Sequence, residues 1–229
     1  MINAPTPELG LKNLRSASME MRLKNENSFP YAGIWLFTGV QGSGKTLLMM
    51  HCLKQMIEEY PDAIVVSNIS IYGTPSYVYR GIEDFEKYKN GAKGTIFVID
   101  EIHTLFSSLQ SANMPESTLT VWSQNRKNRR VILGTSQRFT RVAKGIREQC
   151  TYNYECKNPI FGRIFSYTIR EGDEYDDNGK YVGEEPSQRY FYIPNVNVMR
   201  MYNTLEVVTK DNVSRETSDE KKEVNICKS

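Results

Sequence analysis

The sequence predicts a three-layer α/β fold around a mainly parallel sheet of about five core strands. Short apolar runs alternate along the chain with segments of helical periodicity, which indicates strand–helix–strand units. Two of the runs, Ile34–Phe37 and Thr95–Ile99, are continuously apolar, as is typical of strands buried on both faces. A glycine-rich loop, Gly39–Thr46, separates the first run from a helix. Helices that connect parallel strands cover both faces of the sheet, so three layers are expected.

The elements can be placed in order from their periodicity and from the residues that break it. Met49, Leu53 and Met56 form one apolar stripe on a helix that begins at Thr46 and is closed by Pro61. The predicted strands are 33–38, 63–67, 95–99 and 131–135, and the predicted helices are 46–59, 82–89, 117–128 and 195–208.

The second half of the chain predicts a different arrangement. Phe161–Arg170 and Arg189–Ile193 flank an acidic turn, Asp173–Gly179, and predict a C-terminal β-hairpin. From residue 209 onward the chain is charged and poor in large apolar groups, so a disordered polar tail is expected. The expected organisation is an arm (1–30), a core (31–158), the hairpin with a helix (159–208) and the tail (209–229).

Composition excludes several classes of protein. A net charge of +2 is too small to indicate nucleic-acid binding from the bulk balance, so any such contact needs a local cluster. No apolar run approaches the roughly 18 residues that span a bilayer, and the N-terminus lacks the apolar region of a secretory signal. The cysteines show neither metal-type nor C-x-x-C spacing: Cys52, Cys150, Cys156 and Cys227. These features favour a cytoplasmic protein, with peripheral action at a membrane or on a virion left open.

The glycine-rich loop fits the phosphate-binding pattern G-x-x-x-x-G-K-[ST] at every fixed position. Its predicted ligand-binding residues are Gly39, Val40, Gln41, Gly42, Ser43, Gly44, Lys45 and Thr46. A loop without bulky side chains can point successive backbone N–H groups at phosphates, and the next helix adds its positive dipole end. Lys45 is then placed on the β- and γ-phosphates and the Thr46 hydroxyl on Mg²⁺. The loop therefore predicts binding of ATP and Mg²⁺, rather than a glycine turn before an ordinary helix.

The acids Asp100 and Glu101 end the second apolar run, where a parallel strand delivers side chains to the carboxyl edge of the sheet. Asp100 is expected to hold the metal and Glu101 to activate the attacking water. The alternative is a strand whose acidic end merely reaches solvent. His103 completes an Asp-Glu-Ile-His pattern of helicases, but such helicases need two tandem domains. His103 is therefore expected to be a helix-start residue near the site.

Gln137 follows the strand predicted at 131–135. In ATPases with an extra strand between the loop strand and the acid strand, that strand ends beside the γ-phosphate. A polar side chain there can sense whether the phosphate is present, so Gln137 is the predicted sensor. The alternative is a glutamine that caps a loop.

These elements together resemble the zonula occludens toxin-like ATPases, which include the assembly ATPase of filamentous phages, within the FtsK–HerA branch. The matching stretches are Gly39–Thr46, Val98–Glu101, Trp122–Arg130, Ser136-Gln137 and Met201–Thr204. The resemblance covers roughly residues 31–205 and implies a RecA-like core. It also implies a ring that uses ATP to drive phage or mobile-element DNA through or into a virion or membrane channel. Known members carry a transmembrane segment after this domain; the sequence shows none, which puts direct membrane anchoring in doubt and raises a soluble packaging-type motor as a variant.

A ring of this kind often completes each site with a cation from the neighbouring subunit. Arg126 is the predicted cation, because it lies near the end of the helix that leads to Gln137. Arg129 and Arg130 are alternatives, and cations that only neutralise the helix dipole are another. Arg138 or Arg141 is a candidate for facing DNA instead. The predicted function is ATP hydrolysis coupled to DNA translocation; the rival hypothesis is a nucleotide-switched assembly scaffold that moves no DNA.

Overall fold

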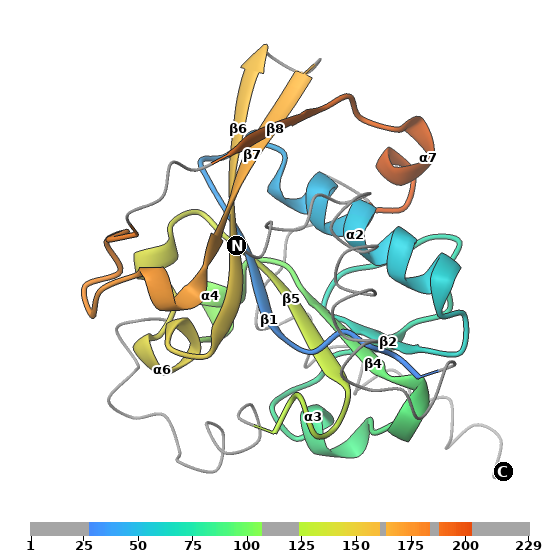
Figure 1. Ribbon diagram of the computed structural model, residues 1–229. Helices are drawn as coiled ribbons and strands as arrows, with labels where there is room; N and C mark the ends of the chain where they lie inside the picture. Colours follow the sequence, from blue (N-terminus) through green and yellow to red (C-terminus); the bar gives the residue numbers. More distant parts are fainter. Residues whose placement is uncertain (1–27, 107–123, 161–163, 184–187, 203–229) are drawn as a thin grey trace, which may run out of the picture.

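The computed structural model describes residues 28–106, 124–160, 164–183 and 188–202. Within these residues one mixed sheet of eight strands runs through the molecule in the order β3-β2-β4-β5-β1-β6-β7-β8 (Figure 1). The strands are β1 Gly33–Thr38, β2 Ile64–Ser67, β3 Tyr77–Val78, β4 Thr95–Ile99, β5 Arg130–Ser136, β6 Cys150–Ile160, β7 Ile164–Glu171 and β8 Arg189–Tyr192. The strands from β3 to β6 pair in parallel, as predicted for the core.

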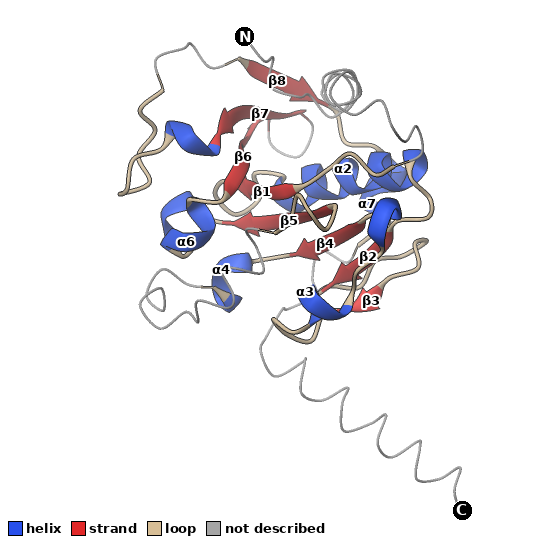
Figure 2. Cartoon of the chain, turned by 60° about the horizontal axis from the view of Figure 1, so that its bottom comes forward, coloured by secondary structure: helices blue, strands red, loops and turns tan. Residues whose placement is uncertain are grey.

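Helices cover both faces of the sheet. They are α2 Lys45–Glu59, α3 Asp84–Lys87, α4 Ile102–Leu105, α6 Lys144–Arg147 and α7 Val196–Met199. Figure 2 shows α2 above the core strands β1, β5, β4 and β2, and α3 and α4 below them. The apolar side chains of α2 and α7 form one core with the upper face, and those of α3, α4 and α6 form a second core with the lower face. The predicted three-layer α/β fold is therefore confirmed.

The order of the strands decides where polar side chains can meet. β5 lies between β1, which leads into the glycine loop, and β4, which ends in the acids. Because these strands are parallel, their carboxyl ends share one edge of the sheet. The extra strand expected between the loop strand and the acid strand is thus β5.

The predicted hairpin forms from β7 and β8, which pair antiparallel. β7 also pairs antiparallel with β6, and β6 pairs in parallel with β1. The hairpin therefore continues the core sheet, and the boundary expected between residues 158 and 159 falls inside β6. At the other end, Phe29 is fully buried and packs edge-to-face on Tyr31 and Tyr60, so the core begins before residue 31.

Three predicted helices differ from the structure. The helix expected over 82–89 is shortened to α3, and the helix expected over 195–208 ends at Met199. Tyr202 forms an antiparallel bridge with Ile71, and this non-local pairing draws the chain out of a helical path. Of the helix expected over 117–128, residues 124–128 form hydrogen-bonded turns and the remainder lies outside the described residues, as do residues 1–27 and 203–229. No helix in the described part of the chain is long and apolar enough to cross a bilayer.

Candidate nucleotide-binding and hydrolysis site

The glycine loop follows β1 directly and depends on two close approaches of other residues. A Cβ atom on Gly39 would lie 2.4 Å from the carbonyl oxygen of Cys156, and one on Gly44 would lie 2.4 Å from Cδ1 of Phe165. Gly44 also has a φ of 87°, in the left-handed region that favours glycine. Both positions therefore accept only glycine, for steric reasons supplied by β6 and β7.

The groups that would hold phosphates converge at the start of α2. This helix has 15 residues and no acidic residue in its first turn, so its N-terminal N–H groups and dipole end stay electropositive. Lys45 is buried, and its Nζ donates to the carbonyl oxygen of Val40, 3.1 Å away across the loop. The hydroxyl of Ser43 is buried too and has no partner among the described residues. A buried cation, an unpaired hydroxyl and a helix N-terminus fit the phosphates of a nucleotide.

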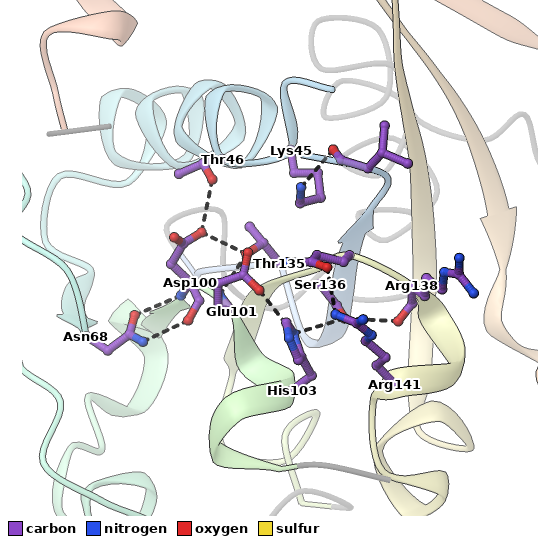
Figure 3. A network of polar contacts seen from close by, with 12 residues as sticks. Lys45, Thr46, Asn68, Asp100, Glu101, His103, Thr135, Ser136, Arg138 and Arg141 are labelled. Carbon is purple, nitrogen blue, oxygen red and sulfur yellow. Dashed lines mark hydrogen bonds and ion pairs between the residues drawn. The ribbon is translucent and has the colours of Figure 1, made fainter. Parts of the chain in front are cut away.

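Asp100 joins the glycine loop to the neighbouring strand (Figure 3). Its Oδ1 accepts hydrogen bonds from the hydroxyl of Thr46 at 3.0 Å and from the hydroxyl of Thr135 at 2.7 Å. Thr46 is the second residue of α2 and Thr135 belongs to the carboxyl end of β5. Mg²⁺ prefers carboxylate and other hard oxygen ligands, so Thr46 and Asp100 form a donor set that fits it. The structure brings these two predicted metal residues together.

Asn68 holds the backbone of Asp100 from the other side. Its Nδ2 donates to the Asp100 carbonyl oxygen at 2.9 Å, and its Oδ1 accepts from the Asp100 N–H at 2.7 Å. Sequence reasoning missed this residue, and it missed the role of Thr135. Both residues lie at or just past the carboxyl end of a strand that neighbours β4. If the order of the strands had been known from the sequence, this position would have identified them as candidates for the site.

Glu101 has a left-handed backbone, with φ 51° and ψ 47°, which is uncommon for any residue with a side chain. Its N–H donates to the Thr135 hydroxyl oxygen at 2.8 Å, which holds this turn in place. Burial raises the pKa of the Glu101 carboxyl, and the charge of Asp100 raises it further, while Lys45 and Arg141 lower it. A carboxylate with a raised pKa is a stronger base, as activation of water requires.

His103 lies in α4, next to the site as predicted. Its Nδ1 is 3.2 Å from Oε2 of Glu101 and 3.2 Å from the hydroxyl oxygen of Ser136, the last residue of β5. Burial lowers the pKa of His103, and the positive charges of Arg141 and Lys45 lower it further, while Asp100 raises it. The imidazole is therefore held toward its neutral form.

Gln137 directly follows β5, at the edge of the sheet that carries the acids. Its Oε1 accepts a hydrogen bond from Nη1 of Arg141 at 2.6 Å. Arg141 is one of the two residues predicted as candidates for DNA contact, and its charge lies close enough to act on Glu101 and His103. The sensor role of Gln137 stays a prediction.

The arginines proposed to act in trans lie at the opposite end of β5. Arg126 is exposed, in the turns that precede the strand. A seven-residue strand spans roughly 20 Å, so Arg126 is far from the acids of its own subunit. Arg130 is only 1% exposed, and this burial removes it as an alternative. Arg129 donates through Nη1 to the carbonyl oxygen of Phe29 at 3.4 Å.

A glycine loop with a buried lysine, a hydroxyl shared with an acid at the end of β4, and a second acid beside it define a P-loop ATPase. The family model described as Zonular occludens toxin (Zot) matches residues 79–185, which include β4, β5, β6 and β7. The predicted resemblance to the zonula occludens toxin-like ATPases is therefore confirmed. A comparison with curated proteins gives no match.

Solved structures of similar fold include the N-terminal domain of zonular occludens toxin from Neisseria meningitidis. It has a TM-score of 0.56 at 16% sequence identity, over 75% of this chain and 99% of that one. The genome packaging NTPase B204 from Sulfolobus turreted icosahedral virus 2, in complex with ATP-gammaS, has a TM-score of 0.47 at 14% identity. That alignment covers 71% of this chain and 98% of B204. The first likeness shows that this chain shares the overall α/β architecture of that domain.

Proposed function

We propose that the chain hydrolyses Mg²⁺-ATP and uses the energy to move the DNA of a phage or mobile element during virion assembly or genome packaging. The ATPase part of this proposal rests on the position of Asp100. Its Oδ1 contacts both Thr46 of the glycine loop and Thr135 of β5. This contact, beside the phosphate loop, supports the role of Asp100 as the acid that would bind the metal. The support for DNA as the cargo is the family match.

Different residues of the site bind the phosphates, hold the metal and activate the water. Backbone N–H groups of the loop and Lys45 bind the phosphates, and Thr46 and Asp100 would hold the metal. When bound, Mg²⁺ supplies positive charge that neutralises the phosphate oxygens. Glu101 orients a water molecule for in-line attack on the γ-phosphorus and accepts its proton, while the bond to the β–γ bridging oxygen breaks. Oε2 of Glu101 faces Nδ1 of His103 at 3.2 Å, which leaves the other carboxylate oxygen, Oε1, for the water.

We further propose that subunits assemble into a ring in which Arg126 completes the site of a neighbour. Its exposure and its distance from the acids of its own subunit support action in trans rather than in cis. Gln137, at the end of β5, would report the γ-phosphate to the rest of the subunit. Arg138 is exposed at the same edge and is a candidate for DNA contact. The partners implied are ATP, DNA, further copies of the chain, and a virion or membrane-channel protein.

The decisive experiment measures the ATPase rate with and without single-stranded and double-stranded DNA, across a range of protein concentrations. Lys45→Ala is the matched control, because it removes the phosphate-binding cation and is expected to abolish binding or turnover. A rate that rises with DNA and with protein concentration supports the motor. Tight nucleotide binding with negligible turnover and no response to DNA would favour the assembly scaffold instead.

A further inference from the structure

We propose that His103 is a positioning residue for Glu101: its Nδ1–H holds one oxygen of the carboxylate and links it to the end of β5. This inference rests on the proposed ATPase function. The contacts that suggest it are the two distances of 3.2 Å from Nδ1, to Oε2 of Glu101 and to the hydroxyl oxygen of Ser136 (Figure 3). One ring nitrogen thus faces two oxygen atoms from different elements.

The hydroxyl of Ser136 fixes which ring nitrogen carries the proton. This hydroxyl has one hydrogen, and it donates that hydrogen to the carbonyl oxygen of Arg138 at 2.9 Å, an atom that can only accept. Toward His103 the Ser136 oxygen is therefore an acceptor. The Glu101 carboxylate is also an acceptor. Two acceptors facing Nδ1 require a hydrogen on Nδ1, so the neutral ring is the Nδ1–H tautomer and Nε2 carries the lone pair.

The surroundings of the ring favour this neutral state. The side chain of His103 is 14% exposed, and Lys45 and Arg141 place positive charge nearby. Asp100 and Glu101 supply the opposing negative charge. A neutral Nδ1–H still donates to the carboxylate and leaves the negative charge of Glu101 available as a base.

Holding one oxygen matters because the glutamate is otherwise free to rotate. Its backbone is fixed by the hydrogen bond to Thr135, but the carboxylate lies three rotatable bonds away. With Oε2 on His103, Oε1 is left to face the water. A displacement of about 1 Å in a reacting group can cost about 10²-fold in rate, so loss of this contact should lower kcat without changing ATP binding.

The first test reads the tautomer and needs no hydrolysis. The chain has two histidines, His51 and His103, so a long-range proton–nitrogen NMR spectrum is simple, and a His103→Asn spectrum assigns it. We expect the neutral Nδ1–H pattern for His103 at neutral pH. The Nε2–H pattern would overturn the proposal.

The second test is a series of substitutions at this one position. An asparagine Nδ2 can occupy the place of the histidine Nδ1, whereas a glutamine Nε2 mimics the far nitrogen and a leucine mimics neither. We expect His103→Asn to keep kcat near wild type, and His103→Gln and His103→Leu to lose about 10²-fold in kcat at unchanged KM and ATP affinity. The pH profile of His103→Asn should keep both limbs, because the ring itself moves no proton.

Two results would contradict the positioning role. If His103→Gln rather than His103→Asn kept kcat near wild type, the group that holds Glu101 would be Nε2. Equal losses of kcat in all three variants would show that the Nδ1 donor does not position Glu101. If the wild-type chain hydrolyses no ATP, the proposed function fails, and the NMR experiment still decides the contact to Glu101. His103→Asn and His103→Gln retain a polar side chain, so misfolding of His103→Leu would not remove the comparison.

Discussion

The two ends of β5 treat polar groups in opposite ways. At the carboxyl end, the hydroxyls of Thr135 and Ser136 are fully buried and contact the side chain of Asp100, the backbone of Glu101 and His103. At the amino end, the Arg130 guanidinium is buried with no hydrogen-bond partner for its three nitrogens among the described residues. It lies instead over the rings of Phe85 and Phe97, at 5.7 and 5.9 Å.

The carboxyl end of β5 therefore supports the reacting groups, whereas its amino end contributes to packing. Short hydroxyls at the carboxyl end give fixed hydrogen bonds to both acids, so this end can orient reacting groups. The amino end places a cation against aromatic faces, and burial lowers the pKa of Arg130 to about 10, while the charge of Glu86 acts against this. We therefore expect changes at the carboxyl end to affect rate, and buried changes at the amino end to affect stability alone. Exposed Arg126 is the exception if it acts in trans.

The largest expected effect is that of Arg126→Ala. An arginine supplied to a neighbouring site can contribute about 10³–10⁵ in rate. Because Arg126 cannot reach the acids of its own subunit, mixing this variant with Glu101→Gln subunits should restore activity in rings that contain some complete sites. Activity independent of protein concentration, without recovery on mixing, would contradict both the ring and this assignment. A merely dipole-neutralising arginine would instead cost about 0.3–1 kcal/mol of stability.

Glu101→Gln should retain Mg²⁺-ATP binding and lose about 10²–10⁴-fold in kcat, since an amide keeps the shape but is a poor base. Asp100→Asn should instead weaken binding in a metal-dependent manner. Binding is measured by nucleotide titration at several Mg²⁺ concentrations, and turnover by phosphate release. Wild-type turnover in both variants would show that the acids are misassigned.

Thr135→Val should cost about 1–3 kcal/mol of stability, because it leaves the N–H of Glu101 without its acceptor in a partly buried turn. It should also lower kcat, since both acids lose a support. Thr135→Ser is the matched control: it keeps the hydroxyl and should keep kcat, and it loses only a buried methyl group, at a cost of about 1 kcal/mol of stability. Denaturant unfolding and steady-state kinetics measure the two effects; equal kcat for Val and Ser would remove Thr135 from the site.

Arg141→Gln should shift the acidic limb of the rate profile to higher pH. The positive charge of Arg141 lowers the pKa of Glu101, and the deprotonated carboxylate is the active form. Without that charge the pKa rises, so activity is lost at a higher pH as the solution is acidified. Arg141→Lys keeps the charge and should keep the limb near its wild-type position. A limb that does not move between wild type and Gln would show that Arg141 does not act on Glu101.

The smallest effect is expected for Arg130→Met at the amino end. The change removes an unpaired buried cation and a cation–π contact together, so the free energy of unfolding should change by no more than about 1 kcal/mol. The rate of ATP hydrolysis should not change. Arg130→Ala should be less stable than Arg130→Met because it leaves a cavity. A large loss of kcat in Arg130→Met would contradict the expectation that buried changes at the amino end of β5 affect stability alone.

Much of the fold and the central motifs were readable from the sequence because their signals are local. Lys45 and Thr46 belong to one contiguous pattern, and Asp100 and Glu101 end one apolar run. The hairpin of β7 and β8 was predicted for the same reason, from its two flanking strands and acidic turn.

The residues that support the acids depend on contacts between distant segments. Asn68 and Thr135 become neighbours of Asp100 only because β2 and β5 flank β4, and strand order is not a local property. The contact of His103 with Glu101 depends on a left-handed turn that residue preferences would not favour at a glutamate. The early end of the last helix likewise follows from a bridge to Ile71, far away in the sequence.

The packing of the glycine loop has a consequence for the order in which the chain is made. The loop is synthesised early, but Gly39 lies against Cys156, and Gly44 lies against Phe165 and under the hydroxyl of Tyr192, which is 3.3 Å from its carbonyl oxygen. A ribosome that has released only the first 150 residues has delivered the loop without these contacts. The nucleotide site is thus completed only after β8 has been made, so a nascent or truncated chain that lacks β8 holds an unfinished loop.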